Sequence, residues 1–289
     1  MTINHSLDIP GYLARLGFDQ RPEPTVDSLF ALQRAHVERI TYENLEIHLG
    51  HPTSVDALES AARIVRGRGG YCFHLNGAFA ALLDALGYDV TLHEGEVRVT
   101  SSDAPDAAVN TNHMVLIVRC GGESWFVDGG LGDAIHEPLP LRAGEYRQGP
   151  FSYGLAPWPA LEGGWWFTHD PAGSFTSMKF TATPVAIEAF APAHERLSTS
   201  PESSFVNTVS VGRRGADVTQ ALRGRVLTVI DAAGKQATTM ETSADWFACL
   251  AEVFDLPLTE VDEAARAKLW QRVCVAHEAW LAAERQKNA

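Results

Sequence analysis

The chain has 289 residues, of which 45% are hydrophobic, and it carries a formal net charge of −13 at pH 7. This length and hydrophobic content are enough for a substantial core built from two or three structural units. The negative charge argues against a general binder of nucleic acids or of anionic membranes. We find no signal-peptide pattern and no apolar run near ~18 residues, so we expect a cytoplasmic protein that meets no membrane.

Residues 1–86 have apolar side chains at helical spacing, and we expect them to form a helical domain. One helix is predicted to follow residues 24–27. A second is predicted after residues 53–56, whose Thr-to-Asp spacing resembles a capping box. A third is predicted to begin beside Cys72, because four apolar residues follow it at helical spacing, namely Phe79, Leu82, Leu83 and Leu86.

Cys72 ends the run Arg-Gly-Gly-Tyr-Cys at residues 68–72. The two glycines allow a tight turn, so the thiol is expected in the first turn of the helix. There the amide dipoles and nearby Arg68 would lower the thiol pKa from about 8.5 and make a thiolate available. The alternative is a buried structural cysteine. The other three cysteines, at 120, 249 and 274, show no spacing typical of a disulfide framework or a metal site, so we expect no metal.

Residues 87–182 are expected to form a compact β-barrel-like domain, because short β runs alternate with glycine and proline. The predicted strands span residues 90–99, 114–118, 125–127, 165–168 and 175–180. His113 opens one of these runs and Asp128 ends the next. A Gly121-Gly122 turn joins the two runs, which predicts a hairpin that brings the histidine and the aspartate to one end of the sheet.

A histidine and a carboxylate are the partners that a cysteine nucleophile requires. His113 would take the thiol proton, while Asp128 would fix the imidazole tautomer and stabilise its charged form. Each residue also has a simpler interpretation, His113 as a polar edge residue and Asp128 as a turn former. The ordered set with Cys72 favours catalysis.

Residues 183–289 are expected to form a third, α/β domain. A helix is predicted to begin at Thr183-Pro184, with the threonine as N-cap and the proline in the first turn. Strands are predicted around residues 205–211 and 225–230. Two helices are predicted at about 243–254 and 260–285, each led by a Thr-x-x-Asp signature.

Taken together, these motifs resemble the arylamine N-acetyltransferase family. The resemblance is carried by the run at residues 68–72, by the histidine-led strand at His113, and by Asp-Gly-Gly-Leu-Gly at residues 128–132. The segments 40–45 and 200–205 are similar to further family elements. The resemblance implies an α+β fold with an N-terminal helical bundle, a cysteine-protease-like nucleophile helix, a β-barrel-like domain and a C-terminal α/β lid.

The resemblance also implies acetyl transfer from acetyl-coenzyme A to an arylamine or a hydrazine. An acetyl-cysteine intermediate at Cys72 and ping-pong kinetics would follow, with backbone amides around the cysteine stabilising the oxyanion. An aromatic acceptor pocket would be lined by Tyr42, Phe73 and Phe205, although each could equally be ordinary packing. His74 could contact the acceptor or hydrogen-bond only to the protein.

Coenzyme A is a polyanion, so an acidic chain needs a local basic or amide-rich site to bind it. Arg68, Gly129 and Gly130 are candidates because they flank the expected site. The remaining arginine candidates stay open, namely Arg66, Arg213, Arg214, Arg223 and Arg225.

Two positions depart from the family pattern. Position 74 is His where relatives usually carry Glu or Gln, and position 131 is Leu where an aromatic residue is common. These departures leave open an amide synthase that releases or cyclises a polyketide chain with the same three residues. A papain- or transglutaminase-like enzyme and a catalytically silent binding module are further alternatives.

Overall fold

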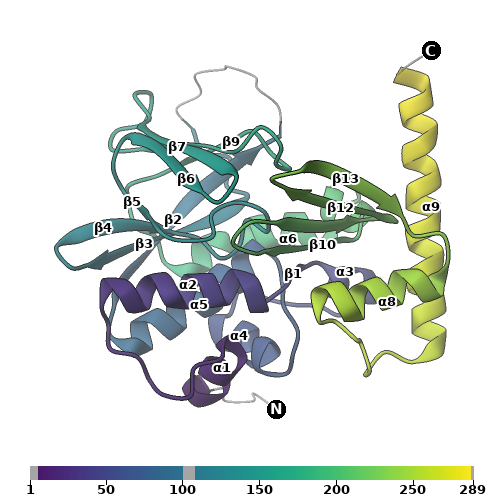
Figure 1. The fold of residues 1–289 in the computed structure, drawn as a ribbon, viewed down its shortest axis with the longest axis horizontal. Coiled ribbons are helices and arrows are strands. Elements are labelled where there is room, and N and C mark those ends of the chain that lie inside the picture. Colours follow the sequence, from purple (N-terminus) through teal and green to yellow (C-terminus); the bar gives the residue numbers. More distant parts are fainter. Residues whose placement is uncertain (1–5, 100–107, 288–289) are drawn as a thin grey trace.

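The structure is a computed structural model that describes residues 6–99 and 108–287. It has a mixed α+β fold, as expected. Helices from the first part of the chain lie beneath an antiparallel sheet, and a second sheet lies beside the first, between it and the C-terminal helices (Figure 1).

The N-terminal part contains five helices among the described residues: α1 (Ile9–Leu16), α2 (Val26–Arg39), α3 (Leu45–Leu49), α4 (Ala57–Val65) and α5 (Cys72–Leu86). The caps explain two of the predicted starts. Thr25 accepts a hydrogen bond from the Ser28 amide, and Asp56 accepts one from the Glu59 amide. The cap of α4 is therefore Asp56 rather than Thr53. Helix α5 is buried on nearly all sides, so it is the central element of the first core.

The larger sheet has eight antiparallel strands in the order β5-β4-β3-β2-β9-β8-β7-β6. Its strands are β2 (Asp89–Arg98), β3 (His113–Cys120), β4 (Glu123–Val127), β5 (Leu139–Pro140), β6 (Gly144–Gln148), β7 (Phe151–Pro157), β8 (Trp165–Thr168) and β9 (Ser177–Phe180). The predicted hairpin is confirmed, because β3 and β4 pair through a two-residue turn at Gly121 and Gly122. Both glycines have positive φ, which this tight hairpin turn requires.

The smaller sheet has five strands in the order β1-β10-β11-β12-β13: β1 (Tyr42–Glu43), β10 (Ser210–Arg214), β11 (Thr219–Arg223), β12 (Val226–Asp231) and β13 (Gly234–Thr239). Its first strand comes from the N-terminal part, since Tyr42 pairs with Gly212. This sheet therefore joins segments that the sequence assigned to the first and third domains.

Two predictions for residues 183–211 were wrong in detail. No helix begins at Pro184, because the amide of Val185 donates to the carbonyl of Leu92 and extends the chain along β2. The helical turns begin later, at the 3-10 helix η1 (Ile187–Phe190), and continue as α6 (Ala191–Thr199). Residues 205–207 are helical, in α7 (Ser204–Asn207), because the Ser203 hydroxyl accepts from the Phe205 amide.

The two last helices are α8 (Ser243–Phe254) and α9 (Glu263–Lys287). Thr242 caps α8 as its signature predicts. Helix α9 is capped by Asp262, which accepts from the Ala265 amide, and not by the threonine three residues earlier. Within residues 6–99 and 108–287, no helix combines the length and the apolar character needed to span a membrane.

Candidate active site

Cys72 is the first residue of α5 and lies against the loop that follows β4. A methyl group on Gly130 would come within 2.8 Å of the Cys72 Cα, so only glycine permits this approach. The Cys72 thiol is 3.6 Å from the carbonyl oxygen of Asn112, the residue just before β3. The cysteine also lines a cavity of about 370 Å³. The sulfur is thus held near the start of β3 and still borders open space.

His113 begins β3 and Asp128 directly follows β4, so the hairpin brings them together. The His113 Nε2 donates to the Asp128 Oδ2 over 2.7 Å, and both side chains are buried. Burial alone would lower the pKa of His113. The charge and hydrogen bond of Asp128, followed by the contact with Cys72, outweigh burial and raise it to about 10. His113 therefore carries a positive charge beside the sulfur at neutral pH.

Asn76 is a site residue that the sequence reasoning missed. It lies one helical turn after Cys72 on α5 and is completely buried. Its amide nitrogen donates to the Asp128 Oδ1 at 2.9 Å and to the Met114 carbonyl at 2.6 Å, and its oxygen accepts from the Gly129 amide at 2.8 Å. Asn76 therefore fixes the carboxylate that pairs with His113. A polar residue four positions after the cysteine, in a mostly apolar helix, was the available signal.

Gly129 and Gly130, which were expected to offer amides to coenzyme A, use these amides inside the protein. The Gly129 amide donates to Asn76, and the Gly130 amide donates to the Asp128 Oδ1 at 2.8 Å. Gly129 also packs where a side chain would meet the ring of His36 at 2.7 Å. The two glycines thus allow close packing around Asp128, and their amides are not free to bind phosphate.

Arg68, the third candidate for coenzyme A, has a different environment from the one expected. Its guanidinium pairs with Glu43 at 3.1 Å, Glu46 at 2.7 Å and Glu260 at 2.8 Å. It does not line the cavity beside Cys72. Arg68 therefore joins α3, β1 and the segment before α9, and its charge is already neutralised by carboxylates.

The cavity beside Cys72 is lined by residues of both sheets and of α7. Tyr42 and Phe205, two of the expected pocket residues, lie in its wall. Phe73 and His74 do not. Phe73 is fully buried against Phe190, with ring centroids 5.6 Å apart. The helical turn points residues 73 and 74 away from the side of α5 that carries the sulfur.

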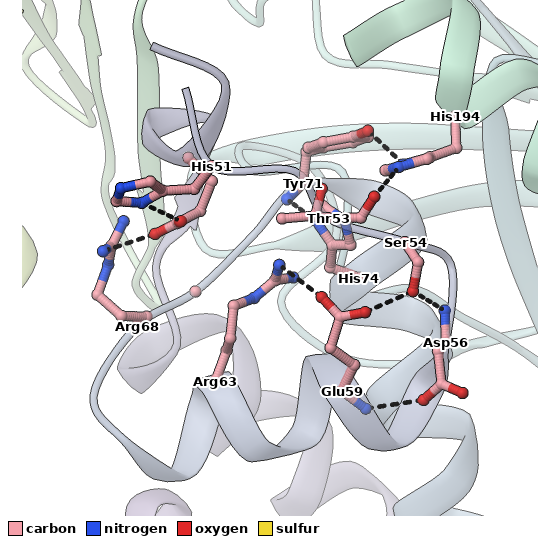
Figure 2. A network of polar contacts seen from close by, with 12 residues as sticks. His51, Thr53, Ser54, Asp56, Glu59, Arg63, Arg68, Tyr71, His74 and His194 are labelled. Carbon is pink, nitrogen blue, oxygen red and sulfur yellow. Dashed lines mark hydrogen bonds and ion pairs between the residues drawn. The ribbon is translucent and has the colours of Figure 1, made fainter. Parts of the chain in front are cut away.

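His74 belongs to a buried polar network on the other side of the helix start (Figure 2). Its Nδ1 accepts from the Tyr71 amide at 3.4 Å, so the ring caps α5. The Tyr71 hydroxyl donates to His194 Nδ1 at 2.6 Å, and His194 Nε2 donates to the Thr53 carbonyl at 2.8 Å. Burial, and then the charge of Arg63, lower the pKa of His74 well below 6.5. His74 is therefore neutral and hydrogen-bonded within the protein, and it does not line the cavity beside Cys72.

Asp133 also lines the cavity, and the sequence reasoning missed it as well. It accepts hydrogen bonds from the Ser174 amide at 2.7 Å and from the Ser174 hydroxyl at 2.9 Å. Burial would raise the pKa of Asp133, but His169 and Ser174 lower it, so the carboxyl group is ionised. This contact ties the loop after β4 to the loop before β9 and fixes one wall of the cavity.

Cys120 and Cys249 are in environments that suppress reactivity. Burial, with a contribution from Glu252, raises the pKa of Cys249 to about 11, and burial also raises the pKa of Cys120. In the part of the chain that the structure describes, we find no group of three or more His, Cys, Asp or Glu side chains arranged to hold a metal ion.

Comparison with known proteins agrees with this geometry. Residues 25–263 match the model of the N-acetyltransferase family. An arylamine N-acetyltransferase of Mycolicibacterium smegmatis is 28% identical over 270 residues, which are 89% of this chain and 94% of the relative. The pineal gland isozyme NAT-3 of Gallus gallus, also an arylamine N-acetyltransferase, is 30% identical over 246 residues, or 78% of this chain and 83% of that one.

Solved structures of arylamine N-acetyltransferases superimpose on most of this chain. The arylamine N-acetyltransferase of Mycobacterium abscessus superimposes with a TM-score of 0.82 at 27% identity, covering 93% of this chain and 95% of that one. The Mycobacterium marinum enzyme in complex with CoA superimposes with a TM-score of 0.81 at 27% identity, covering 92% and 98%. The fold and the family match define an acetyltransferase. The chain belongs to the arylamine N-acetyltransferase family.

Proposed function

We propose that this enzyme transfers the acetyl group of acetyl-coenzyme A to an arylamine or a hydrazine by a ping-pong mechanism through an acetyl-Cys72 intermediate. One observation carries the proposal: a cysteine at the start of a buried helix lines a cavity beside a histidine that a buried aspartate holds at 2.7 Å. We place the reaction in the cytoplasm, a reducing compartment that keeps a catalytic thiol free.

In the first half-reaction, the Cys72 sulfur attacks the carbonyl carbon of the donor thioester. A carbon–sulfur bond forms to Cys72 and the bond to coenzyme A breaks. His113, which is protonated at neutral pH, gives its proton to the departing thiolate. Asp128 keeps Nε2 occupied, so the proton moves through Nδ1, the ring nitrogen that the aspartate leaves free.

In the second half-reaction, the amine nitrogen attacks the acetyl-cysteine carbonyl. His113, now neutral, takes a proton from this nitrogen, and Cys72 leaves as a thiolate beside the recharged imidazolium. The oxyanion formed in each half-reaction needs donors. The amides of Cys72 and Phe73 open α5 and so have no carbonyl partner within the helix. Donors of this kind are worth ~3 kcal/mol each in other enzymes.

The acceptor would enter the cavity between Tyr42 and Phe205, whose rings offer stacking surfaces for an arylamine. In this proposal the first part of the chain (1–86) supplies the nucleophile, the second (87–182) supplies its base and carboxylate, and the third (183–289) acts as a lid over the cavity. Phe205 and β10 contribute to the cavity from that third part, which supports this role.

Two other acyl-transfer functions were considered. An amide synthase would use the same three residues with a polyketide thioester as donor, and a papain- or transglutaminase-like enzyme would act on peptides or glutamine. The two relatives described above match over most of the chain and are named for acetyl transfer to arylamines, which favours the acetyltransferase.

Intact-mass spectrometry tests the proposal directly. Incubation with acetyl-coenzyme A should add one acetyl group, peptide mapping should place it on Cys72, and hydrazine or an arylamine should remove it. Cys72→Ser should show no thioester adduct, whereas Cys120→Ser should behave as the wild type. An unmodified protein would contradict acetyl transfer, and an adduct formed only with a longer acyl thioester would favour the amide synthase.

A further inference from the structure

Tyr42 brings a hydroxyl group to the cavity beside Cys72. It lies on β1, which pairs with β10 and also bridges to Gly70, two residues before the cysteine. Its ring packs against Gly132, where an added methyl group would come within 3.4 Å of the Tyr42 Cγ. These contacts, from the strand on one side and the loop after β4 on the other, hold the ring in the wall of the cavity.

The Tyr42 hydroxyl has no protein partner in the part of the chain that the structure describes. It makes no hydrogen bond there, and it is not among the polar atoms that are enclosed without a partner. Two other polar side chains of the cavity wall are already paired. The Asn112 amide group bonds to the backbone of Val97 at 2.7 and 3.0 Å, and the Ser174 hydroxyl donates to Asp133 at 2.9 Å. The Tyr42 hydroxyl is therefore free to bond to a molecule in the cavity.

This hydroxyl is a donor at neutral pH. Burial, and then the charge of Cys72, raise the pKa of Tyr42 well above 10. The charge of Arg223 acts in the opposite direction but does not outweigh them. The phenol therefore keeps its proton, and it lies within electrostatic reach of the sulfur at which the reaction takes place.

We propose that the Tyr42 hydroxyl donates a hydrogen bond to the carbonyl oxygen of the acetyl group and stabilises the oxyanion in both half-reactions. This inference rests on the proposed function, because it assumes acyl transfer at Cys72. The attacking sulfur supplies an electron pair to the carbonyl carbon, and the π pair of the carbonyl moves to its oxygen. When that pair returns, the bond to coenzyme A breaks and His113 protonates the departing sulfur. The hydroxyl keeps its own proton throughout.

Tyr42 adds to the amides that begin α5. The free amides of Cys72 and Phe73 belong to the helix, whereas the hydroxyl comes from β1, a separate element of the cavity wall. A donor that is already fixed in place needs no reorganisation as the negative charge develops on the oxygen. The pairing of β1 and the packing on Gly132 give Tyr42 this fixed position.

Two reactions of Cys72 test this role, because only one of them forms an oxyanion. Acetylation by acetyl-coenzyme A passes through a tetrahedral oxyanion, whereas alkylation by iodoacetamide displaces iodide directly. Tyr42→Phe should slow adduct formation at saturating acetyl-coenzyme A roughly 100-fold, the loss expected for one oxyanion donor. Alkylation should proceed at the wild-type rate. The concentration of acetyl-coenzyme A that gives half the maximal rate should not change, since the bond strengthens only as the oxyanion forms.

The second half-reaction gives an independent measurement. Discharge of acetyl-Cys72 by hydrazine should be slowed in Tyr42→Phe by a similar factor, and hydrazine has no ring that could stack on residue 42. Tyr146→Phe is a matched control, because it removes a hydroxyl that donates to the Arg142 carbonyl at 2.7 Å, on β6 and away from the cavity. This control should equal the wild type in acetylation, alkylation and discharge.

The outcomes separate this inference from the proposed function. A Tyr42→Phe variant that forms and discharges the adduct as fast as the wild type would overturn the inference and leave the proposed function standing. Equal slowing of acetylation and alkylation would also overturn it, since the hydroxyl would then act on the sulfur and not on the carbonyl oxygen. If the wild type itself forms no adduct with acetyl-coenzyme A, the proposed function fails.

Discussion

Two buried histidines flank the start of α5, and they have opposite charge states. His113 and His74 are each only 2% exposed. His113 lies 2.7 Å from the Asp128 carboxylate, and its pKa is raised to about 10. His74 lies on the other side, where burial and the charge of Arg63 lower its pKa well below 6.5.

The comparison shows that the charge of the nearest partner, and not the depth of burial, decides which histidine can serve the cysteine. The guanidinium of Arg63 is buried and donates no hydrogen bond within the described part of the chain, and the carboxylate of Glu59 is 3.8 Å away (Figure 2). A proton on His74 would therefore be repelled by Arg63. The sequence pattern placed His113 beside Asp128, but it left the role of His74 open.

Removing the carboxylate at His113 should have the largest effect. Asp128→Asn should slow adduct formation with acetyl-coenzyme A by on the order of 10³-fold or more, because the imidazolium loses its counter-charge and the tautomer is no longer fixed. Stopped-flow mass analysis measures this rate. Glu59→Gln removes a carboxylate from the His74 side and should leave the rate within about threefold of the wild type. Equal losses in the two variants would contradict the comparison.

The Asp128→Asn variant should also change how the free energy of unfolding depends on pH. The pKa of His113 is raised in the folded state, so the paired imidazolium stabilises the fold fully below pH 6.5, and this contribution is lost as the pH rises through about 10. The difference in unfolding free energy between wild type and Asp128→Asn should shrink over that range in urea titrations. A difference that stays constant from pH 6 to pH 10 would mean that His113 is not charged in the folded protein.

Asn76 tests whether Asp128 must be held in place. Asn76→Ala removes three hydrogen bonds around the carboxylate and should slow adduct formation by roughly 10- to 100-fold while destabilising the protein by about 2–3 kcal/mol. The pH–rate profile separates positioning from folding, because a displaced Asp128 should shift it toward lower pH. A loss of stability with an unchanged rate and profile would make Asn76 purely structural.

His74→Gln should change the acid response. The lowered pKa means that His74 stabilises the fold above pH 6.5, and that this contribution is lost as the pH falls, because the unfolded chain takes up a proton that the folded protein cannot. The variant should therefore lose less stability than the wild type between pH 7 and pH 5, by up to about 2 kcal/mol. Adduct formation should stay within about threefold of the wild type. Identical acid responses would show that His74 is protonated in the fold.

His74→Glu should produce the smallest effect. A carboxylate at this position would lie near the buried Arg63 guanidinium and give it a partner. We expect about 1 kcal/mol of added stability at pH 7, since pairing offsets an existing buried charge. Urea unfolding measures the change, with Gln236→Glu, at an exposed position of β13, as the control. A destabilised His74→Glu variant would mean that Arg63 already has its charge satisfied.

The sequence predicted the parts of the site that depend on local patterns. The Gly121-Gly122 turn and the alternating strands were enough to place His113 beside Asp128, and the glycines before Cys72 were enough to start α5. Each of these features depends on residues within about one hairpin or one helical turn.

The sequence did not predict features that depend on distant pairings. Arg68 is neutralised in part by Glu260, 192 residues away, and β1 from the first part of the chain pairs with β10 from the third. His74 points into the Tyr71 and His194 network because of the direction of α5, which no short motif encodes. Arg68 and His74, which the sequence suggested as site residues, therefore each contact a residue far away in the sequence and lie outside the cavity beside Cys72.

The most direct test of the account is an NMR titration of the imidazole nitrogens, with His113 and His74 assigned from the His113→Gln and His74→Gln spectra. We expect His113 to be doubly protonated at pH 8 and to lose its proton near pH 10, whereas His74 should stay neutral well below pH 6.5. A neutral His113 at pH 8, or a protonated His74 at pH 7, would contradict it.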